Sequence, residues 1–173
     1  NLKKIFTQGV ELSLEYQLSD HLKANIAYQY LQTGDLDVIN KIKEGKLFRR
    51  DALGNDVRVS LEEYGGLFHR PTHSANIRLT YQNNQLGLFS TIRVNLKSKY
   101  GFKDINSNLI LDDASEYAPG YAIFNWNISK ELFKILTLSV GINNIFDKKD
   151  TRLLAVYPGR TFFISINLNY VKQ

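Results

Sequence analysis

The chain has 173 residues, a formal net charge of +5 and 43% hydrophobic residues. Cysteine is absent, which excludes disulfides and thiolate metal sites. Apolar runs fall short of the ~18 residues of a transmembrane helix, and basic residues are interspersed with acids, which argues against nucleic-acid binding.

The N-terminal part of the chain predicts a hairpin of two strands. Apolar and polar residues alternate over residues 10–19 and again over residues 22–30, with a short turn at Ser19-Asp20-His21. Successive side chains of a strand point to opposite sides, so each segment has one apolar face and one polar face. Because Asn1-Leu2-Lys3-Lys4 leads directly into a strand pattern, we expect a mature or truncated product.

The rest of the chain alternates between strand patterns and connections. Residues 32–71 have no sustained period and carry many charges and glycines, so we expect an irregular loop there, and a second long loop over residues 101–120. A third connection runs over residues 147–159. Five further segments show the alternation of a strand: residues 75–82, 86–99, 122–129, 136–143 and 160–170.

The seven alternating segments favour a membrane β-barrel. Their length, near ten residues, is what a tilted strand needs to cross a bilayer, and short connections alternate with long ones. The polar face carries Glu15, Arg78 and Arg93, which suit a watery lumen better than a dry core. The alternative is a soluble sandwich or lipocalin-like barrel, whose apolar face would point inward.

Four motifs resemble the C-terminal part of TonB-dependent outer-membrane receptors, in the order and spacing of that family. They are Thr7-Gln8-Gly9-Val10-Glu11-Leu12, Arg70-Pro71-Thr72-His73-Ser74-Ala75-Asn76, Gly141-Ile142-Asn143-Asn144-Ile145-Phe146-Asp147-Lys148 and Pro158-Gly159-Arg160-Thr161-Phe162-Phe163. The resemblance implies an all-β fold, a transmembrane antiparallel β-barrel of 22 strands with a plugged lumen. Residues 1–173 would supply about the last seven strands and no plug. Seven strands alone would leave two unpaired edges in lipid, so we expect one fragment of a larger receptor.

One departure from the family concerns the end of the chain. Family members usually end on an aromatic residue, whereas Val171-Lys172-Gln173 follows Tyr170 here.

The resemblance also implies a function. The protein would be a multi-pass receptor of the cell outer membrane that imports a scarce metal chelate or tetrapyrrole (siderophore, haem or cobalamin) in a TonB-dependent manner. Its partners would be the remainder of the barrel and its plug, the TonB complex acting through the plug, outer-membrane lipid and a small-molecule ligand, with a surface lipoprotein as a further candidate. Nucleic acid is not among the expected partners.

Two other functions remain open. A passive porin or surface-binding barrel would lack energy coupling, and an upstream plug with a TonB box would distinguish the two readings. An outer-membrane hydrolase would need a nucleophile paired with a base at the barrel rim. The sequence offers no convincing set of this kind, so we expect no enzyme activity.

Candidate ligand-binding residues lie in the first long connection: Arg49, Arg50, Tyr64, Phe68 and His69. Arginines and aromatic rings suit an anionic, aromatic chelate through charge-assisted bonds and stacking, and the neutral imidazole of His69 suits haem or another metal chelate. The alternative is an ordinary solvated loop with histidines at turns and strand starts.

The second long loop has the spacing of a calcium-binding loop. Oxygen-bearing side chains occupy its first, third, fifth and ninth positions: Asp104, Asn106, Asn108 and Asp112. However, Leu109 stands where such a loop has its turn glycine, and Ser115 stands where it has a bidentate carboxylate. The sequence therefore leaves two interpretations, a solvated loop or one stiffened by calcium, which is the one cofactor we consider.

Overall fold

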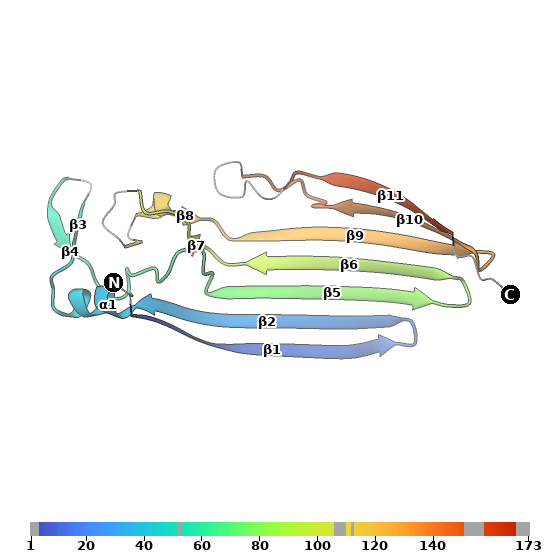
Figure 1. Ribbon diagram of the computed structural model, residues 1–173, viewed down its shortest axis with the longest axis horizontal. Helices are drawn as coiled ribbons and strands as arrows, with labels where there is room; N and C mark the ends of the chain where they lie inside the picture. The colour runs from blue at the N-terminus through green and yellow to red at the C-terminus, as the bar shows by residue number, and fades with distance from the viewer. Residues whose placement is uncertain (1–3, 52, 106–109, 112, 151–157, 169–173) are drawn as a thin grey trace. The chain divides into compact units, whose positions relative to one another are not determined.

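The computed structural model describes residues 4–51, 53–105, 110–111, 113–150 and 158–168. Its main element is a seven-stranded antiparallel sheet of order β1-β2-β5-β6-β9-β10-β11 (Figure 1). The strands are β1 (Ile5–Ser19), β2 (Leu22–Asp35), β5 (His73–Asn83), β6 (Leu88–Lys97), β9 (Tyr121–Leu132), β10 (Leu136–Asn143) and β11 (Thr161–Leu168). Each of the seven expected strands is confirmed, and each pairs with its neighbour along the chain.

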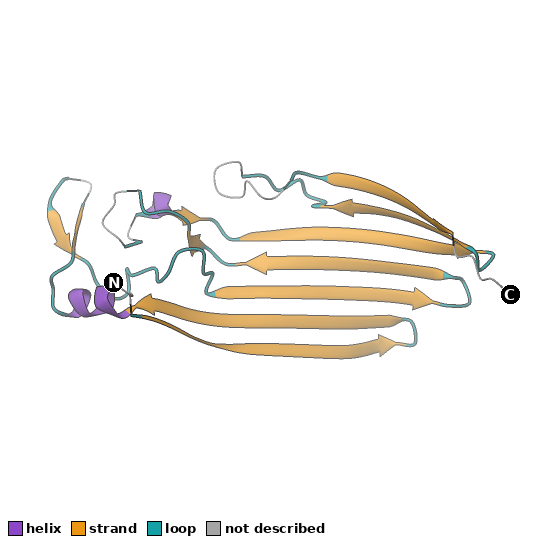
Figure 2. Ribbon diagram, in the orientation of Figure 1, coloured by secondary structure: helices purple, strands orange, loops and turns teal. Residues whose placement is uncertain are grey.

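The first long connection is more regular than the sequence suggested. It contains the helix α1 (Leu36–Lys43) and a hairpin of β3 (Phe48–Arg50) and β4 (Asp56–Arg58) (Figure 2). The second connection contains β7 (Tyr100–Gly101), the 3-10 turn η1 (Ala114–Glu116) and β8 (Tyr117–Ala118). None of the described helices is long and apolar enough to cross a bilayer.

The prediction of an irregular first loop was wrong because α1 is capped at both ends and buries Ile42. The side chain of Asp35 accepts hydrogen bonds from the main-chain N–H groups of Asp37 and Val38 at the N-terminus of the helix. At the other end Gly45 has a φ of +67°, which suits the residue after a helix. A helix of 8 residues is too short to show a clear period in the sequence.

Contacts divide the chain into two compact units. One comprises Asn1–Glu11, Gln29–Ser74 and Lys97–Tyr121, and so holds both long connections. The other comprises Leu12–Tyr28, Ala75–Leu96 and Ala122–Gln173, and so holds the tight turns and the β10–β11 pair.

The register of β10 and β11 confirms the alternation of apolar and polar residues. Ile166 lies opposite Leu138, and Ile164 lies opposite Val140. Apolar residues therefore share one face of the pair and polar residues share the other. The apolar residues of β11 are also highly exposed, with Ile164 at 79%, so this face needs apolar surroundings other than the chain itself.

Phe163 breaks the polar pattern of β11, and the structure gives the reason. Phe163 lies directly opposite Gly141 of β10. A Cβ atom at position 141 would overlap the ring of Phe163. The aromatic ring therefore covers a glycine across the strand pair, an arrangement that compensates for the missing side chain.

This pair makes a prediction about stability. Gly141→Ala should destabilise the folded receptor by about 1–3 kcal/mol, because the new methyl group collides with the ring of Phe163. Urea unfolding in detergent would measure the change, with Thr137→Ala as the control on the same face of β10. The effect of Gly141→Ala should shrink in a Phe163→Ala background, and equal effects in both backgrounds would contradict the proposed contact.

Candidate functional site

The two long connections meet in a small apolar core. Ile42 of α1, Val59 after β4 and Ile110 of the second connection are buried, and Tyr64 packs against them. Residues far apart in the sequence are thereby held together, so the connections form a folded unit that can position side chains.

Arg49 forms an ion pair within this unit. Its Nε and Nη2 atoms donate to Oε1 of Glu63 at 3.2 and 2.8 Å. The other carboxylate oxygen of Glu63 accepts the main-chain N–H of Ser60 at 2.8 Å. The bond from Ser60 and then Arg49 lower the pKa of Glu63 below its ordinary value of 4.5. The charge of Arg49 is thus compensated inside the chain, and the pair holds β3 to the segment after β4.

This ion pair predicts a pH-dependent loosening of the first connection. Because folding lowers the pKa of Glu63, its stabilisation is complete above the unfolded value of 4.5 and is lost as the pH falls through the folded pKa. Hydrogen exchange of the peptide spanning residues 47–63, corrected for intrinsic rates, should therefore accelerate below about pH 4.5. Glu63→Gln should already show faster exchange at about pH 6, whereas Glu62→Gln should match the unmodified chain. Equal exchange rates in all three proteins would contradict a stabilising role of the ion pair between Arg49 and Glu63.

Arg50 is placed differently. It lies opposite Asp56 in the β3–β4 hairpin, with 3.7 Å between Arg50 Nε and Asp56 Oδ1. Both side chains are strongly exposed, at 82% and 73%. Such a pair is weak in water, so the guanidinium of Arg50 remains accessible to an anion.

Tyr64 belongs to a pocket in the first unit, which we call the loop pocket. The pocket has a volume of about 330 Å³, and its lining includes Phe6, Tyr30, Thr33, Tyr64, Gly66 and Arg70. The hydroxyl oxygen of Tyr64 accepts the main-chain N–H of Asp35 at 2.9 Å, and burial raises the pKa of Tyr64. The loop pocket therefore combines aromatic rings with the cation of Arg70.

His69 lies against aromatic rings of the second connection. Its ring is 5.2 Å from the ring of Phe102, edge to face, and 6.4 Å from that of Tyr100. Its main-chain N–H donates to the carbonyl of Gly101 at 2.7 Å, and its φ is +57°. In the described part of the chain, no three His, Asp or Glu side chains gather in a way that could hold a metal ion.

The calcium hypothesis rests largely on residues outside the described ranges. Asp104 is described, whereas Asn106, Asn108 and Asp112 are not. The structure does assign a role to Glu116, which is completely buried. Its two carboxylate oxygens accept the main-chain N–H groups of Ile105 and Asp113, each at 3.0 Å. Glu116 therefore stabilises this connection through hydrogen bonds to its buried carboxylate. Calcium binding stays a prediction.

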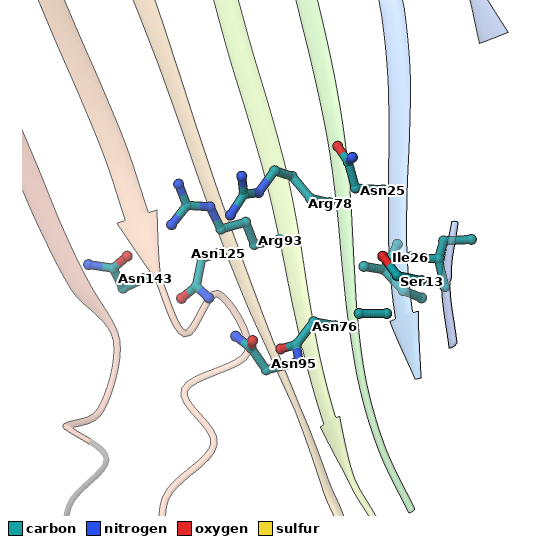
Figure 3. Close-up of a pocket in the computed structure, with 11 residues that line it drawn as sticks. Ser13, Asn25, Ile26, Asn76, Arg78, Arg93, Asn95, Asn125 and Asn143 are labelled. Carbon is teal, nitrogen blue, oxygen red and sulfur yellow. The ribbon is translucent and has the colours of Figure 1, made fainter. Parts of the chain in front are cut away.

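A second pocket, here the polar pocket, lies in the other unit (Figure 3). Its volume is about 500 Å³. Six strands contribute its polar lining: Ser13 of β1, Asn25 of β2, Asn76 and Arg78 of β5, Arg93 and Asn95 of β6, Asn125 of β9 and Asn143 of β10. All of them belong to the polar face that the alternation predicted, which the structure thereby confirms.

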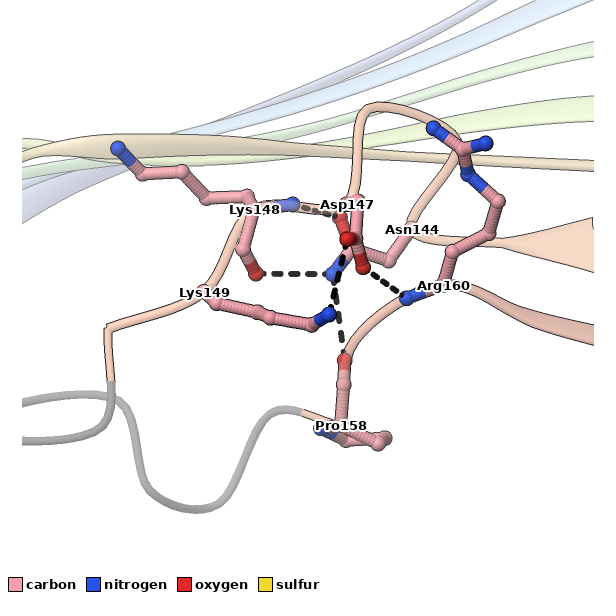
Figure 4. A network of polar contacts seen from close by, with 6 residues as sticks. All are labelled: Asn144, Asp147, Lys148, Lys149, Pro158 and Arg160. Carbon is pink, nitrogen blue, oxygen red and sulfur yellow. Dashed lines mark hydrogen bonds and ion pairs between the residues drawn. The ribbon is translucent and has the colours of Figure 1, made fainter.

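Asn144 anchors the connection between β10 and β11 (Figure 4). It is 4% exposed. Its Oδ1 atom accepts the main-chain N–H of Lys148 at 2.9 Å, and its Nδ2 atom donates to the carbonyls of Lys148 at 2.9 Å and Pro158 at 3.2 Å. Its own main-chain N–H donates to the side-chain oxygen of Asn125 at 3.0 Å. One side chain thus joins the beginning of the connection to its end.

Asp147 reinforces the same junction. Its Oδ1 atom accepts the main-chain N–H of Arg160 at 2.6 Å, and its Oδ2 atom pairs with Lys149 at 2.9 Å. The bond from Arg160 and then the bond from Lys149 lower the pKa of Asp147. Two motifs that the sequence presented as separate, around residues 141–148 and 158–163, are therefore parts of one structure.

Comparison with known families identifies the fold. Residues 1–145 match the family model described as "TonB dependent receptor-like, beta-barrel". The chain belongs to this family. No curated protein matches the sequence of this TonB-dependent receptor chain.

Solved structures of related receptors share the fold. A mutant of the ferric enterobactin receptor PfeA from Pseudomonas aeruginosa has a TM-score of 0.63 and 22% identity, over 95% of this chain and 22% of that one. The ferric yersiniabactin uptake receptor FyuA from Yersinia pestis has a TM-score of 0.56 and 15% identity, over 94% of this chain and 22% of that one. The copper transporter OprC has a TM-score of 0.63 and 16% identity, over 97% of this chain and 24% of that one. This receptor chain therefore spans about a quarter of the length of these proteins.

The candidate ligand residues of this receptor chain fall into separate groups. Arg49 and Arg50 lie on β3, Tyr64 lines the loop pocket, and His69 contacts Phe102; Phe68 is partly exposed. The sequence did not single out Phe6, Tyr30 or Arg70 as ligand residues. Arg70 was visible only as part of a family motif, and no sequence signal places Phe6 and Tyr30 beside Tyr64.

Proposed function

We propose that this chain forms wall and outer loops of an outer-membrane receptor that imports a scarce metal chelate or tetrapyrrole in a TonB-dependent manner. The observation that carries the proposal is the family match over residues 1–145. The names of the similar structures support the proposed substrate class, because they are receptors for ferric enterobactin and ferric yersiniabactin and a copper transporter. Siderophores, haem and cobalamin are the candidate ligands.

The membrane arrangement follows from the two faces of the sheet. We infer that the apolar face contacts lipid and the polar face contacts the lumen, because a barrel in a bilayer alternates in this way. The edge strands β1 and β11 would pair with the remainder of the barrel, since unpaired edges are not tolerated in lipid. The plug, the TonB complex acting through it and a surface lipoprotein are the further proposed partners.

Ligand contact is proposed for two places in the first unit. One is the loop pocket, and the other is the exposed guanidinium group of Arg50 on β3. Aromatic rings of Tyr30 and Tyr64 can stack on a planar chelate, and the guanidinium of Arg70 can pair with its negative groups. Arg49 is assigned a supporting role, since its guanidinium group already forms an ion pair with Glu63. His69 and Phe68 are retained as candidates for a haem-like ligand.

Binding measurements on the intact receptor would test this function. A panel of ferric siderophores, haem and cobalamin should contain at least one ligand, and Arg70→Gln should weaken an anionic one about tenfold, since a charge-assisted bond contributes ~1.5–3 kcal/mol. Lys46→Gln, which removes an exposed cation of the same unit, is the matched control. Uptake that persists in cells lacking TonB would contradict active import and favour a passive porin. Failure of every panel member to bind would remove the proposed substrate class.

Calcium binding by the second connection is a separate proposal. If Asp104, Asn106, Asn108 and Asp112 hold the ion, protease cleavage near Asn108 should become faster when a chelator removes calcium. The control is Asp56→Asn, which lies outside the loop. Identical cleavage with and without calcium would remove the proposal.

A further inference from the structure

The apolar face of the sheet carries aromatic side chains near the connection between β10 and β11. Trp126 of β9 lies opposite Ile142 of β10, and Ile142 lies opposite Phe162 of β11. Phe124 precedes Trp126 by two residues on the same face, and the ring of Phe146 packs on it edge to face, with 5.0 Å between the ring centres. Phe146 and Phe162 remain 69% and 70% exposed, so this end of the face offers aromatic contacts to a molecule outside the chain.

Cationic side chains follow directly on these aromatic residues: Lys148, Lys149 and Arg160 (Figure 4). The charge of Lys149 is compensated, because its Nζ atom pairs with Asp147 Oδ2 at 2.9 Å. The exposed side chains of Lys148 and Arg160 instead extend away from the Asp147 carboxylate (Figure 4). Within the described ranges, no ion pair includes Lys148 or Arg160. These two positive charges therefore favour an anionic partner.

Arg160 is placed on the same side of the sheet as the exposed aromatic rings. It stands two residues before Phe162, and side chains two residues apart in an extended chain point to the same side. Its main-chain N–H donates to Asp147 Oδ1 at 2.6 Å, which fixes the chain at the start of β11. From Ile164 to Phe162 to Arg160, this face therefore changes from aliphatic to aromatic to cationic. A lipid with an anionic headgroup has the complementary order, from acyl chain to charge.

We propose that Phe146, Lys148, Arg160 and Phe162 form a binding site for a phosphorylated lipid of the outer leaflet, here the rim site. The phosphate pairs with Lys148 and Arg160, and the acyl chains lie against the rings of Phe146 and Phe162. The inference rests on the proposed function, which turns the apolar face to lipid and the long connections to the outside. The charge of the rim site would suit any phosphate, whereas its exposed aromatic rings suit only a phosphate that carries apolar chains.

Native mass spectrometry of the intact, delipidated receptor tests the rim site. The receptor would be titrated with bisphosphorylated lipid A and with the same glycolipid without its phosphates. We expect preferential binding of the phosphorylated form, and Lys148→Gln combined with Arg160→Gln should weaken it about tenfold, because charge-assisted bonds are lost. The matched control is Lys130→Gln combined with Lys134→Gln, which removes two exposed cations at the opposite end of β9 and should leave binding unchanged.

Three outcomes would overturn the inference: equal binding of the two glycolipids, equal weakening by the two double variants, or displacement of the bound glycolipid by an excess of inorganic phosphate. The last would show a site for free anions. Phe146→Ala combined with Phe162→Ala separates these cases further, since it should weaken glycolipid binding through lost apolar contact, and unchanged binding would exclude the acyl-chain contact. None of these measurements uses a transported ligand or TonB. A failed ligand panel would therefore reject the proposed import and leave the lipid result standing.

Discussion

Asn144→Ala is expected to be among the most destabilising single changes in the β10–β11 region, at about 2–4 kcal/mol. The substitution removes three hydrogen bonds of a buried side chain and leaves the carbonyls of Lys148 and Pro158 and the N–H of Lys148 without that partner. A buried polar group that loses its partner costs about 1–3 kcal/mol. Asn144 also has a φ of +52°, which asparagine tolerates better than alanine. Urea unfolding of the receptor in detergent would measure the loss.

Two further variants separate the causes of this effect. Asn143→Ala removes an exposed side chain with one long bond, 3.3 Å to Thr161, and should cost little. Asn144→Gly keeps the positive φ but loses the side-chain bonds, so it should remain strongly destabilising. If Asn144→Gly were as stable as the unmodified receptor, backbone conformation alone would explain the effect of alanine, and the hydrogen-bond network would be unimportant.

The sheet was predictable because its main signal is local. Alternation places Ile164 and Ile166 on one face, and their cross-strand partners Val140 and Leu138 obey the same rule. The sequence of each strand therefore determines which side chains share a face, and the tight turns determine which strands pair. Phe163 is an exception to this alternation. The residue that explains its position is Gly141, on the neighbouring strand.

The structure of the connections was harder to predict, because it depends on contacts between residues that are far apart in the sequence. The core of the first unit joins Ile42, Val59 and Ile110, which no sequence period connects. The same difficulty affected the candidate ligand residues. Arg49 was selected for its charge, but its ion pair with Glu63 becomes visible only when the β3–β4 hairpin has folded. The positions of Arg78 and Arg93 on the polar face were easier to predict, since both residues follow the alternation of their strands.

Ile164→Arg is expected to destabilise the receptor in liposomes by about 2–4 kcal/mol, the cost of an arginine at the bilayer midplane on the lipid face of a barrel. Ile164 lies well inside β11, opposite Val140, and its side chain is 79% exposed. An arginine there cannot easily reach the interface, and the neighbours that β10 places on that face, Leu138 and Val140, are apolar and cannot compensate for its burial in lipid.

The matched control is Asn167→Arg, on the polar face of the same strand and opposite Thr137. This substitution should change the unfolding free energy by less than about 0.5 kcal/mol, as expected for a water-exposed position. Spin labels should agree, with Leu79 and Ile164 reporting hydrocarbon and Arg78 and Asn167 reporting water. If arginine were tolerated at position 164 and rejected at position 167, the apolar face would be the inner one. The interpretation as a soluble barrel would then replace the interpretation as a membrane barrel, and the polar pocket around Arg78 and Arg93 would face outward.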